Sequence, residues 1–124
     1  MDIFGQTSDG EAVQIAEITG GGLTARIMSW GAAVQDLRLK GHDAPLVLGF
    51  QEFADYPAHS AYFGSNPGRN VNRIRDGALV IDGRTYALEK NFRGRHTLHG
   101  GSNGIGTRNW TFVAVARDEA VLEI

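Results

Sequence analysis

The sequence predicts an all-β fold, and two observations support this prediction. Apolar and polar residues alternate in several short segments, as they do in strands, whereas no window keeps the apolar spacing of a helix over three turns. The breaks between these segments are rich in glycine, which makes up 17 of the 124 residues, roughly twice the usual share. We therefore expect a series of short strands joined by glycine-containing turns.

The N-terminal part of the chain is expected to form three alternating strands and a further short apolar one. The first strand is predicted at residues 13–18, where apolar residues flank polar ones. The second, over 23–28, alternates with a period of two after the glycine run 20–22, and the third spans 34–39. A turn containing glycine and proline then precedes the short strand predicted at 46–48.

The C-terminal part is predicted to contain two hairpins. In residues 79–88, Asp82 and Gly83 separate two strand-like runs and suit the two left-handed positions of a type I′ turn. Strands at 110–116 and 120–124, joined by a polar turn, form the second hairpin. Because the sequence ends inside a predicted strand, we expect an N-terminal piece of a longer β-protein. The alternative is a naturally short chain whose last strand is an ordinary edge.

Two long segments lack a strand pattern. Residues 50–72 mix aromatic residues with proline and glycine, and residues 91–109 contain five glycines. Ordered loops of this length often carry function, because they present side chains from a rigid scaffold. Candidate site residues are therefore expected in these two segments.

The composition excludes several classes of protein. A net charge of -2 and a pI of about 6.0 give no general attraction to nucleic acid or anionic membranes, so neither is expected as a partner. The absence of cysteine excludes disulfides and thiolate zinc sites, and it is compatible with the reducing cytoplasm, where we expect the protein. No apolar run approaches the ~20 residues that span a bilayer. The segment from Arg69 to Arg95 is a local exception, with seven basic residues against three acidic ones.

The segment Tyr62–Ile74 contains the first candidate site. Arg69, Asn70, Asn72 and Arg73 follow one another closely, and in an extended chain the asparagines would point to one side and the arginines to the other. Guanidinium and amide groups suit neutral polyols, which offer both donors and acceptors. The alternative is that the asparagine side chains form hydrogen bonds with the backbone groups of turns.

The second candidate site is the segment His96–Gly101. Its histidines, His96 and His99, could form a metal pair, but no further ligand cluster follows, so no metal is expected. A hydrogen-bonding or proton-transfer role is favoured because imidazole titrates near neutrality. The alternative is a structural turn with one exposed histidine. The glycine-rich loop 100–106 lacks a Gly-Lys-Ser/Thr ending and a βαβ context, so no nucleotide site is expected.

Several motifs occur in an order typical of one family. They are Ser29–Val34, Leu46–Phe50, Tyr62–Gly64, Gly68–Ile74, Asp82–Leu88, Asn91 and Leu98–Gly101, followed by Trp110. In these motifs the chain closely resembles the N-terminal third of the aldose 1-epimerases, the galactose mutarotase family. The resemblance covers nearly the whole chain and implies an antiparallel β-sandwich of the supersandwich type. Residues 1–124 would be the N-terminal portion of this single domain, which is incomplete at its C-terminus.

The resemblance implies an aldose 1-epimerase, or mutarotase, that interconverts the α and β anomers of free hexoses such as galactose and glucose. A carboxylate takes the proton of the C1 hydroxyl and a histidine protonates the ring oxygen, without cofactor or metal. Asn72 and Arg73 match family residues that contact the sugar. His99 matches the histidine that binds or polarises the ring oxygen. Arg69 matches the family's Gly-Arg and is a further candidate ligand.

The chain also departs from the family pattern. The family's proton-donating histidine, a sugar-binding aspartate and the general-base glutamate lie further along than this sequence extends, and neither His96 nor Glu123 replaces them. We therefore expect the chain alone to be inactive. The alternatives are a non-catalytic carbohydrate-binding domain and a hexose-phosphate epimerase of the same superfamily. The surplus of basic residues between Arg69 and Arg95 keeps the second alternative open.

Overall fold

The structure, a computed structural model, describes residues 1–60 and 62–124. Within these ranges ten strands form one four-stranded sheet and three two-stranded ones, and every pairing is antiparallel. The helical elements of the same ranges are one five-residue α-helix and two short 3₁₀ turns. The all-β prediction is therefore confirmed. None of the helices described is long and apolar enough to cross a membrane.

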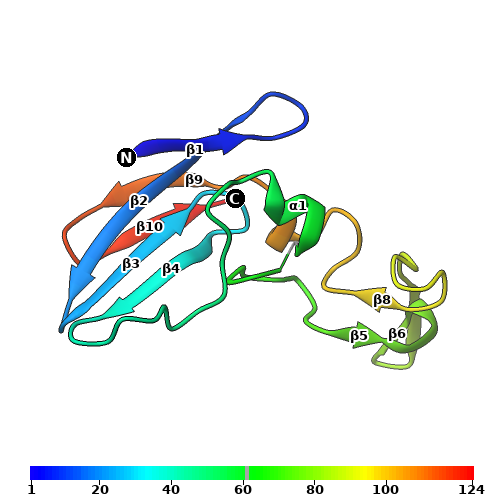
Figure 1. The fold of residues 1–124 in the computed structure, drawn as a ribbon. Helices are drawn as coiled ribbons and strands as arrows, with labels where there is room; N and C mark the ends of the chain where they lie inside the picture. Colours follow the sequence, from blue (N-terminus) through cyan, green and yellow to red (C-terminus); the bar gives the residue numbers. More distant parts are fainter. Residues whose placement is uncertain (61) are drawn as a thin grey trace.

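The main sheet has the strand order β1–β2–β3–β4 (Figure 1). Its strands are β1 (Asp2–Gln6), β2 (Ala12–Gly20), β3 (Leu23–Met28) and β4 (Ala33–Leu39). The paired strands are β5 (Arg73–Ile74) with β8 (Thr97–Leu98), β6 (Ala78–Ile81) with β7 (Arg84–Ala87), and β9 (Thr111–Val115) with β10 (Ala120–Glu123). Helix α1 spans Asp55–His59, and the 3₁₀ turns span Arg75–Gly77 and Ile105–Thr107. Strands β5 to β8 form a small lobe, residues 73–98, which projects from the main sheet in Figure 1.

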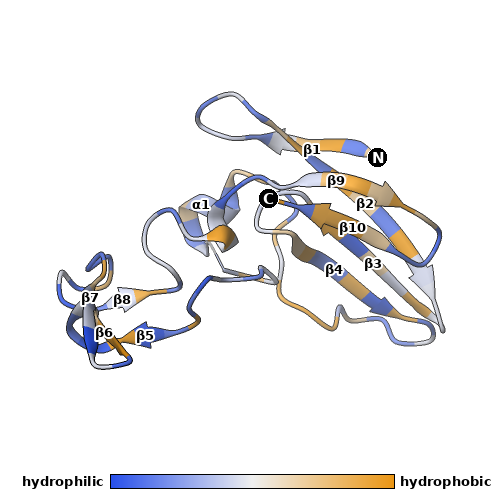
Figure 2. Ribbon diagram, turned by 180° about the vertical axis from the view of Figure 1, so that it is seen from behind, coloured by the Kyte–Doolittle hydropathy of each residue, from blue (hydrophilic) through white to orange (hydrophobic). Residues whose placement is uncertain are grey.

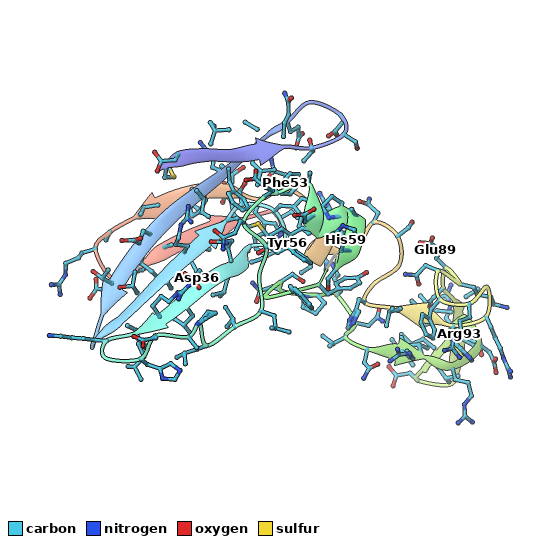
Figure 3. The ribbon with its side chains drawn as sticks, in the orientation of Figure 1. Asp36, Phe53, Tyr56, His59, Glu89 and Arg93 are labelled. Atoms are coloured by element: carbon cyan, nitrogen blue, oxygen red, sulfur yellow. The ribbon has the colours of Figure 1, made fainter. Side chains whose placement is uncertain are left out.

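One face of the main sheet carries the buried core. Ile15, Met28 and Ala33 are cross-strand neighbours in β2, β3 and β4, so their side chains share a face. Phe53 and Tyr56, from the loop and helix that follow β4, pack against these residues. Figure 3 shows both aromatic side chains between α1 and the sheet. The core thus joins the sheet to the segment that leads to the small lobe.

Tyr56 lies at the centre of an aromatic cluster. Its side chain is fully buried. The rings of Phe4, Trp30 and Phe50 meet its ring edge-on, with centroid distances of 6.3, 6.4 and 5.2 Å. Its phenol oxygen accepts the backbone N–H of Phe50 at 3.1 Å. Burial disfavours the charged phenolate and therefore raises the pKa of Tyr56.

The opposite face of the main sheet is also apolar. Ala16, Ile27 and Val34 are cross-strand neighbours on this face. The β9–β10 hairpin lies against it, since Trp110 and Leu122 line a cavity of about 470 Å³ together with Ile27 and Val34. Figure 2, which views the molecule from behind, shows apolar stretches in β9 and β10 beside the sheet. A sheet with two apolar faces needs a covering layer on each side, and these layers are the α1 segment and the hairpin.

Most of the predicted strands are confirmed, and one is wrong. Strands β2, β3 and β4 and both predicted hairpins occur where the sequence places them. In the β6–β7 turn, Asp82 and Gly83 have φ angles of 50° and 76°, as a type I′ turn requires. The strand predicted at 46–48 does not form. Leu46 donates its N–H to the carbonyl oxygen of Leu37 at 2.8 Å, but no ladder continues from it in the described chain.

The sequence does not predict β1, α1, the 3₁₀ turns or the short β5–β8 pair. Strand β1 contains a register shift between Ile3 and Gly5, which breaks the alternation that would reveal it. A Cβ atom at Gly5 would overlap the side chain of Phe53, so the glycine leaves room for a core residue. Helix α1 is only five residues long and contains Pro57, so it is too short to show a helical period.

Residues 62–70, which we call the strap, connect the main sheet to the small lobe. The N–H of Val34 donates to the carbonyl oxygen of Gly64 at 3.0 Å. Asn66 donates its backbone N–H to Gly31 at 3.0 Å and its side-chain amide to the carbonyl of Ala32 at 2.7 Å. Gly64 has a φ of 64°, and a Cβ atom there would overlap the carbonyl oxygen of Val34. Glycine is therefore required at this position by both conformation and space.

Replacing Gly64 with alanine is expected to lower the free energy of unfolding by more than the same change at Gly41. Both residues have a positive φ, 64° and 82°, which costs an L-residue about 1–2 kcal/mol. Gly41 has no atom within 4 Å of the added Cβ, whereas Gly64 has the backbone of Val34. Urea denaturation of the two variants measures the difference. Equal losses of stability would contradict the packing requirement at Gly64.

Candidate functional site

The short β5–β8 pair brings three of the predicted site residues together. Arg73 pairs with Leu98, so Asn72 and His99 lie opposite one another at the end of the pair. The N–H of His99 donates to the carbonyl oxygen of Asn72 at 3.1 Å, and the N–H of Asn72 donates to Nδ1 of His99 at 3.1 Å. Two hydrogen bonds thus join residues that are 27 positions apart in the sequence.

The bond from Asn72 determines which nitrogen of His99 carries the proton. Neutral imidazole has one N–H and one acceptor nitrogen, and Nδ1 is the acceptor here. The proton of neutral His99 is therefore on Nε2, which is left as a hydrogen-bond donor. Both residues have left-handed backbones, with φ angles of 61° at Asn72 and 51° at His99. Asparagine and histidine adopt this conformation more readily than most residues do.

Arg73 completes a group of donors. Its Nη1 donates to Oδ1 of Asn72 at 2.8 Å, and its guanidinium lies 4.4 Å from the ring centroid of Phe92. The cation–π contact and the hydrogen bond hold the guanidinium beside Asn72. The amide nitrogen of Asn72, the other guanidinium N–H groups and Nε2 of His99 are left to donate. None of the hydrogen bonds described at these three residues involves a carboxylate.

Arg69 and Asn70 lie apart from this group. Arg69 is exposed on the strap, and no hydrogen bond found among the described residues links it to the three donors. The amide nitrogen of Asn70 is buried, without a partner in the same described part of the chain. The expected alternation of side chains along an extended segment is wrong, because the left-handed backbone of Asn72 interrupts it before β5 begins at Arg73.

His96 forms its hydrogen bond within the small lobe and not with the donor group. Its Nδ1 accepts the N–H of Asp76 at 3.0 Å, while Arg95 donates from Nε to the Asp76 carboxylate at 2.6 Å. The hydrogen bond from Arg95, with smaller contributions from nearby charges, lowers the pKa of Asp76. His96 therefore does not act with His99 as a pair. In the residues that the structure describes, no group of three His, Cys, Asp or Glu could hold a metal ion.

Glu89 and Asn91 hold the segment on either side of His99. Oε2 of Glu89 accepts the backbone N–H of Ser102 at 2.8 Å and its hydroxyl at 3.0 Å. These bonds, the backbone one first, lower the pKa of Glu89. The Asn91 side chain donates to the carbonyl of Leu98 at 2.9 Å and accepts its N–H at 2.8 Å. Glu89 carries no sequence signal of this role, because its contact with Ser102 forms only when the chain turns back on itself.

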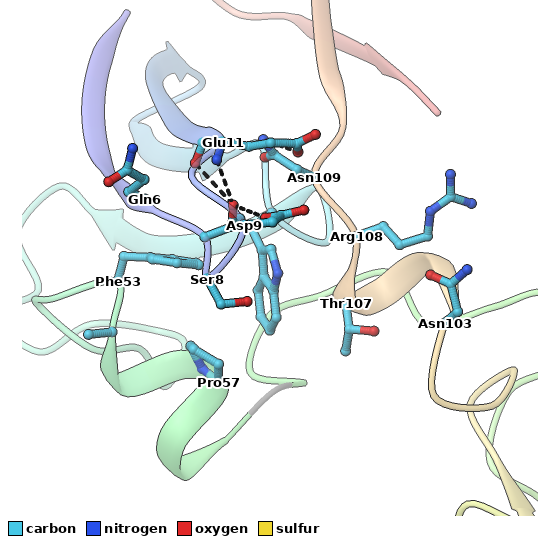
Figure 4. Close-up of a pocket in the computed structure, with 13 residues that line it drawn as sticks. Gln6, Ser8, Asp9, Glu11, Phe53, Pro57, Asn103, Thr107, Arg108 and Asn109 are labelled. Atoms are coloured by element: carbon cyan, nitrogen blue, oxygen red, sulfur yellow. Dashed lines mark hydrogen bonds between the residues drawn. The ribbon is translucent and has the colours of Figure 1, made fainter.

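One cavity beside the β1–β2 turn is separate from the donor group. It has a volume of about 660 Å³ and lies between the β1–β2 turn, α1 and the loop before β9 (Figure 4). Asp9 and Glu11 form one wall, and Asn103 and Arg108 form another. None of the predicted site residues lines it. The donor group is instead at the end of the β5–β8 pair, where the small lobe meets the strap, and Figure 1 shows this pair apart from the main sheet.

The stability that Glu89 gives to this turn is expected to depend on pH. Its pKa in the folded chain is below the ordinary 4.5, so its contribution is complete above about pH 4.5 and is lost as the pH falls through the lowered value. The chemical shift of the Ser102 amide, followed by NMR, should titrate in this acidic range. Glu89→Gln should abolish that titration, and Glu119→Gln, in an exposed turn, should leave it. A titration that persists in Glu89→Gln would contradict the assignment.

Comparisons with known proteins agree with the motifs. The sequence profile of the aldose 1-epimerase family matches residues 14–124. Rat galactose mutarotase is 37% identical over 113 residues, which are 88% of this chain and 33% of that protein. A probable aldose 1-epimerase from Arthroderma benhamiae is 36% identical over 112 residues, or 84% of this chain and 26% of the relative. The chain thus spans about a third or less of the length of these relatives.

Solved structures of aldose epimerases also resemble this chain. The GalM/aldose epimerase homologue from C. elegans matches with a TM-score of 0.81 and 34% identity, over 91% of this chain and 36% of that one. Galactose 1-epimerase from Lactobacillus acidophilus shares the fold, with a TM-score of 0.75 over 95% of this chain and 35% of its own. The strands therefore form part of the antiparallel β-sandwich of the aldose epimerases, as the sequence predicts. This chain belongs to the aldose 1-epimerase family.

Proposed function

We propose that the chain provides the hydrogen-bond-donating part of the sugar site of a mutarotase, which interconverts the α and β anomers of a free hexose such as galactose or glucose. The main support is the fixed Nε2–H of His99 beside the donors of Asn72 and Arg73. A sugar offers hydroxyl and ring oxygens that accept such bonds. Residues 1–124 would be the N-terminal portion of a single sandwich domain. The cysteine-free chain suits a cytoplasmic location.

In the proposed reaction His99 acts on the ring oxygen of the sugar. Its Nε2–H donates a hydrogen bond to that oxygen, while Asn72 and Arg73 hold the hydroxyl groups. A base removes the proton of the C1 hydroxyl, the bond between C1 and the ring oxygen breaks, and the ring oxygen takes up a proton. Rotation about the C1–C2 bond and reclosure give the other anomer. Arg69, exposed on the strap, would contact a more distant part of the sugar.

The base and the main proton donor lie outside the group of donors in this proposal. A carboxylate base must accept a proton, whereas Asn72, Arg73 and His99 are all placed to donate. The 124-residue chain alone would therefore bind a hexose without catalysing mutarotation.

Galactose binding by the chain is expected to depend on His99. His99→Ala removes a donor to the sugar and should weaken the affinity by about three- to tenfold, the effect of one lost hydrogen bond. His42→Ala is the matched control, because His42 lies in an exposed turn after β4. NMR titration with galactose measures both variants, and polarimetry on fresh α-galactose should show no saturable acceleration by any of them. Equal affinities in the two variants would remove His99 from the proposed site.

A chimeric enzyme tests the catalytic part of the proposal. Residues 14–124 of this chain replace the matching N-terminal segment of rat galactose mutarotase, which is 37% identical to it. The chimera should accelerate mutarotation in a polarimeter. His99→Ala in the chimera should lower kcat about 100-fold, as expected when a donor to developing negative charge is lost. An active chimera that tolerates His99→Ala, but not Arg73→Ala, would indicate that the chain binds sugar without acting on the ring oxygen.

One observation favours a phosphorylated hexose as the substrate. Arg93 lies 5.1 Å from the centroid of the Phe92 ring, on which Arg73 also packs at 4.4 Å. A second guanidinium thus lies near the proposed sugar site, and guanidinium groups bind phosphate well. Comparison of glucose with glucose 6-phosphate in the NMR titration separates the two candidates. Tighter binding of the phosphate ester that is lost in Arg93→Gln would favour a hexose-phosphate epimerase.

A further inference from the structure

We infer that Tyr62 is a positioning residue for His99, which holds the imidazole so that its Nε2–H points to the ligand. The two rings are packed together, with a centroid distance of 4.5 Å and an interplanar angle of 47°. This distance is at the short end of the range for aromatic pairs. The inference deepens the proposed function, on which it rests for the identity of the ligand.

Tyr62 can serve as a support because its neighbours in the strap are fixed to the main sheet. The next residue, Phe63, stacks on Phe50 at 5.4 Å and packs against the hydrophobic core. Gly64 then accepts the N–H of Val34 at 3.0 Å. Two consecutive aromatic residues therefore contact different parts of the molecule: Phe63 contacts the core, and Tyr62 contacts His99.

The hydrogen bond from Asn72 does not fully fix the orientation of the imidazole, and the Tyr62 ring restricts the tilting that remains. The bond to Nδ1 fixes the tautomer of His99 and the direction of one ring nitrogen. It does not by itself prevent the imidazole from tilting about the axis of that bond. His99 is only partly buried, and the Tyr62 ring supplies the packed surface that limits such tilting. One contact thus comes from Asn72, beside the small lobe, and the other from the strap.

Tyr62 also connects the donor group to the main sheet through its contact with His99. The donors of Asn72, Arg73 and His99 are held together within and beside the small lobe. Tyr62 reaches one of them, His99, from a strap bonded to β4. The distance between the imidazole and the sheet is therefore set in part by this aromatic contact.

The test uses Tyr62→Phe and Tyr62→Leu in the 124-residue chain, with Tyr86→Leu in the exposed β6–β7 hairpin as the matched control. Long-range ¹H–¹⁵N NMR reports the tautomer of His99, and hydrogen exchange reports the protection of the Asn72 amide. Tyr62→Phe and Tyr86→Leu should keep both signals. Tyr62→Leu should broaden or average the imidazole signals, reduce the Asn72 protection and weaken galactose affinity by about three- to tenfold. If Tyr62→Leu does not fold, Tyr62→Met provides the same test with a flexible side chain.

Two results would overturn the inference. Unchanged His99 signals and Asn72 protection in Tyr62→Leu would show that the ring does not hold the imidazole. Equal losses in Tyr62→Phe and Tyr62→Leu would assign the effect to the phenol hydroxyl instead. Failure of the proposed function is distinguishable, because a chain that binds no galactose still reports the His99 tautomer and the Asn72 amide.

Discussion

Asn72 and His99 are joined by two hydrogen bonds, and the arrangement of the candidate site depends on them. One bond aligns the two backbones, and the other uses Nδ1 of His99 as its acceptor. Arg73 then donates to the side chain of Asn72, and each of the three residues keeps donor groups that these bonds do not use. In the proposed function, this single local pairing provides the donors that bind the oxygens of a sugar.

The small lobe keeps this pairing in place by means that differ from those of the main sheet. The sheet is stabilised by apolar packing on both faces, with Tyr56 at the centre of one layer. In the small lobe, side chains bond to backbone groups, as Glu89 does to Ser102 and Asn91 to Leu98. Such bonds fix the left-handed backbone of His99 without a hydrophobic core of the usual kind. Because one acceptor in these bonds is the Glu89 carboxylate, we expect acid to weaken this turn.

Much of the fold could be predicted from the sequence, because the signals are local. Alternation reveals β2, β3 and β4, and Asp82 with Gly83 identifies the type I′ hairpin. Local sequence signals do not predict the structure where a tertiary contact overrides them. Strand β1 is hidden by Gly5, whose missing side chain makes room for Phe53. Residues 46–48 are apolar and extended in pattern, yet they make no ladder in the described chain, because a strand needs a partner as well as a pattern.

By itself, the sequence determined the family, the strand-rich fold and the residue types of the candidate site. These follow from composition, local alternation and ordered motifs, which need no knowledge of distant contacts. Only the tertiary structure decided that His99, and not His96, joins Asn72, and that the imidazole keeps its proton on Nε2. It also decided that the ring of Tyr62 packs on that imidazole. The reason is physical: hydrogen bonds and ring contacts between residues 27 and more positions apart exist only after the chain has turned back on itself.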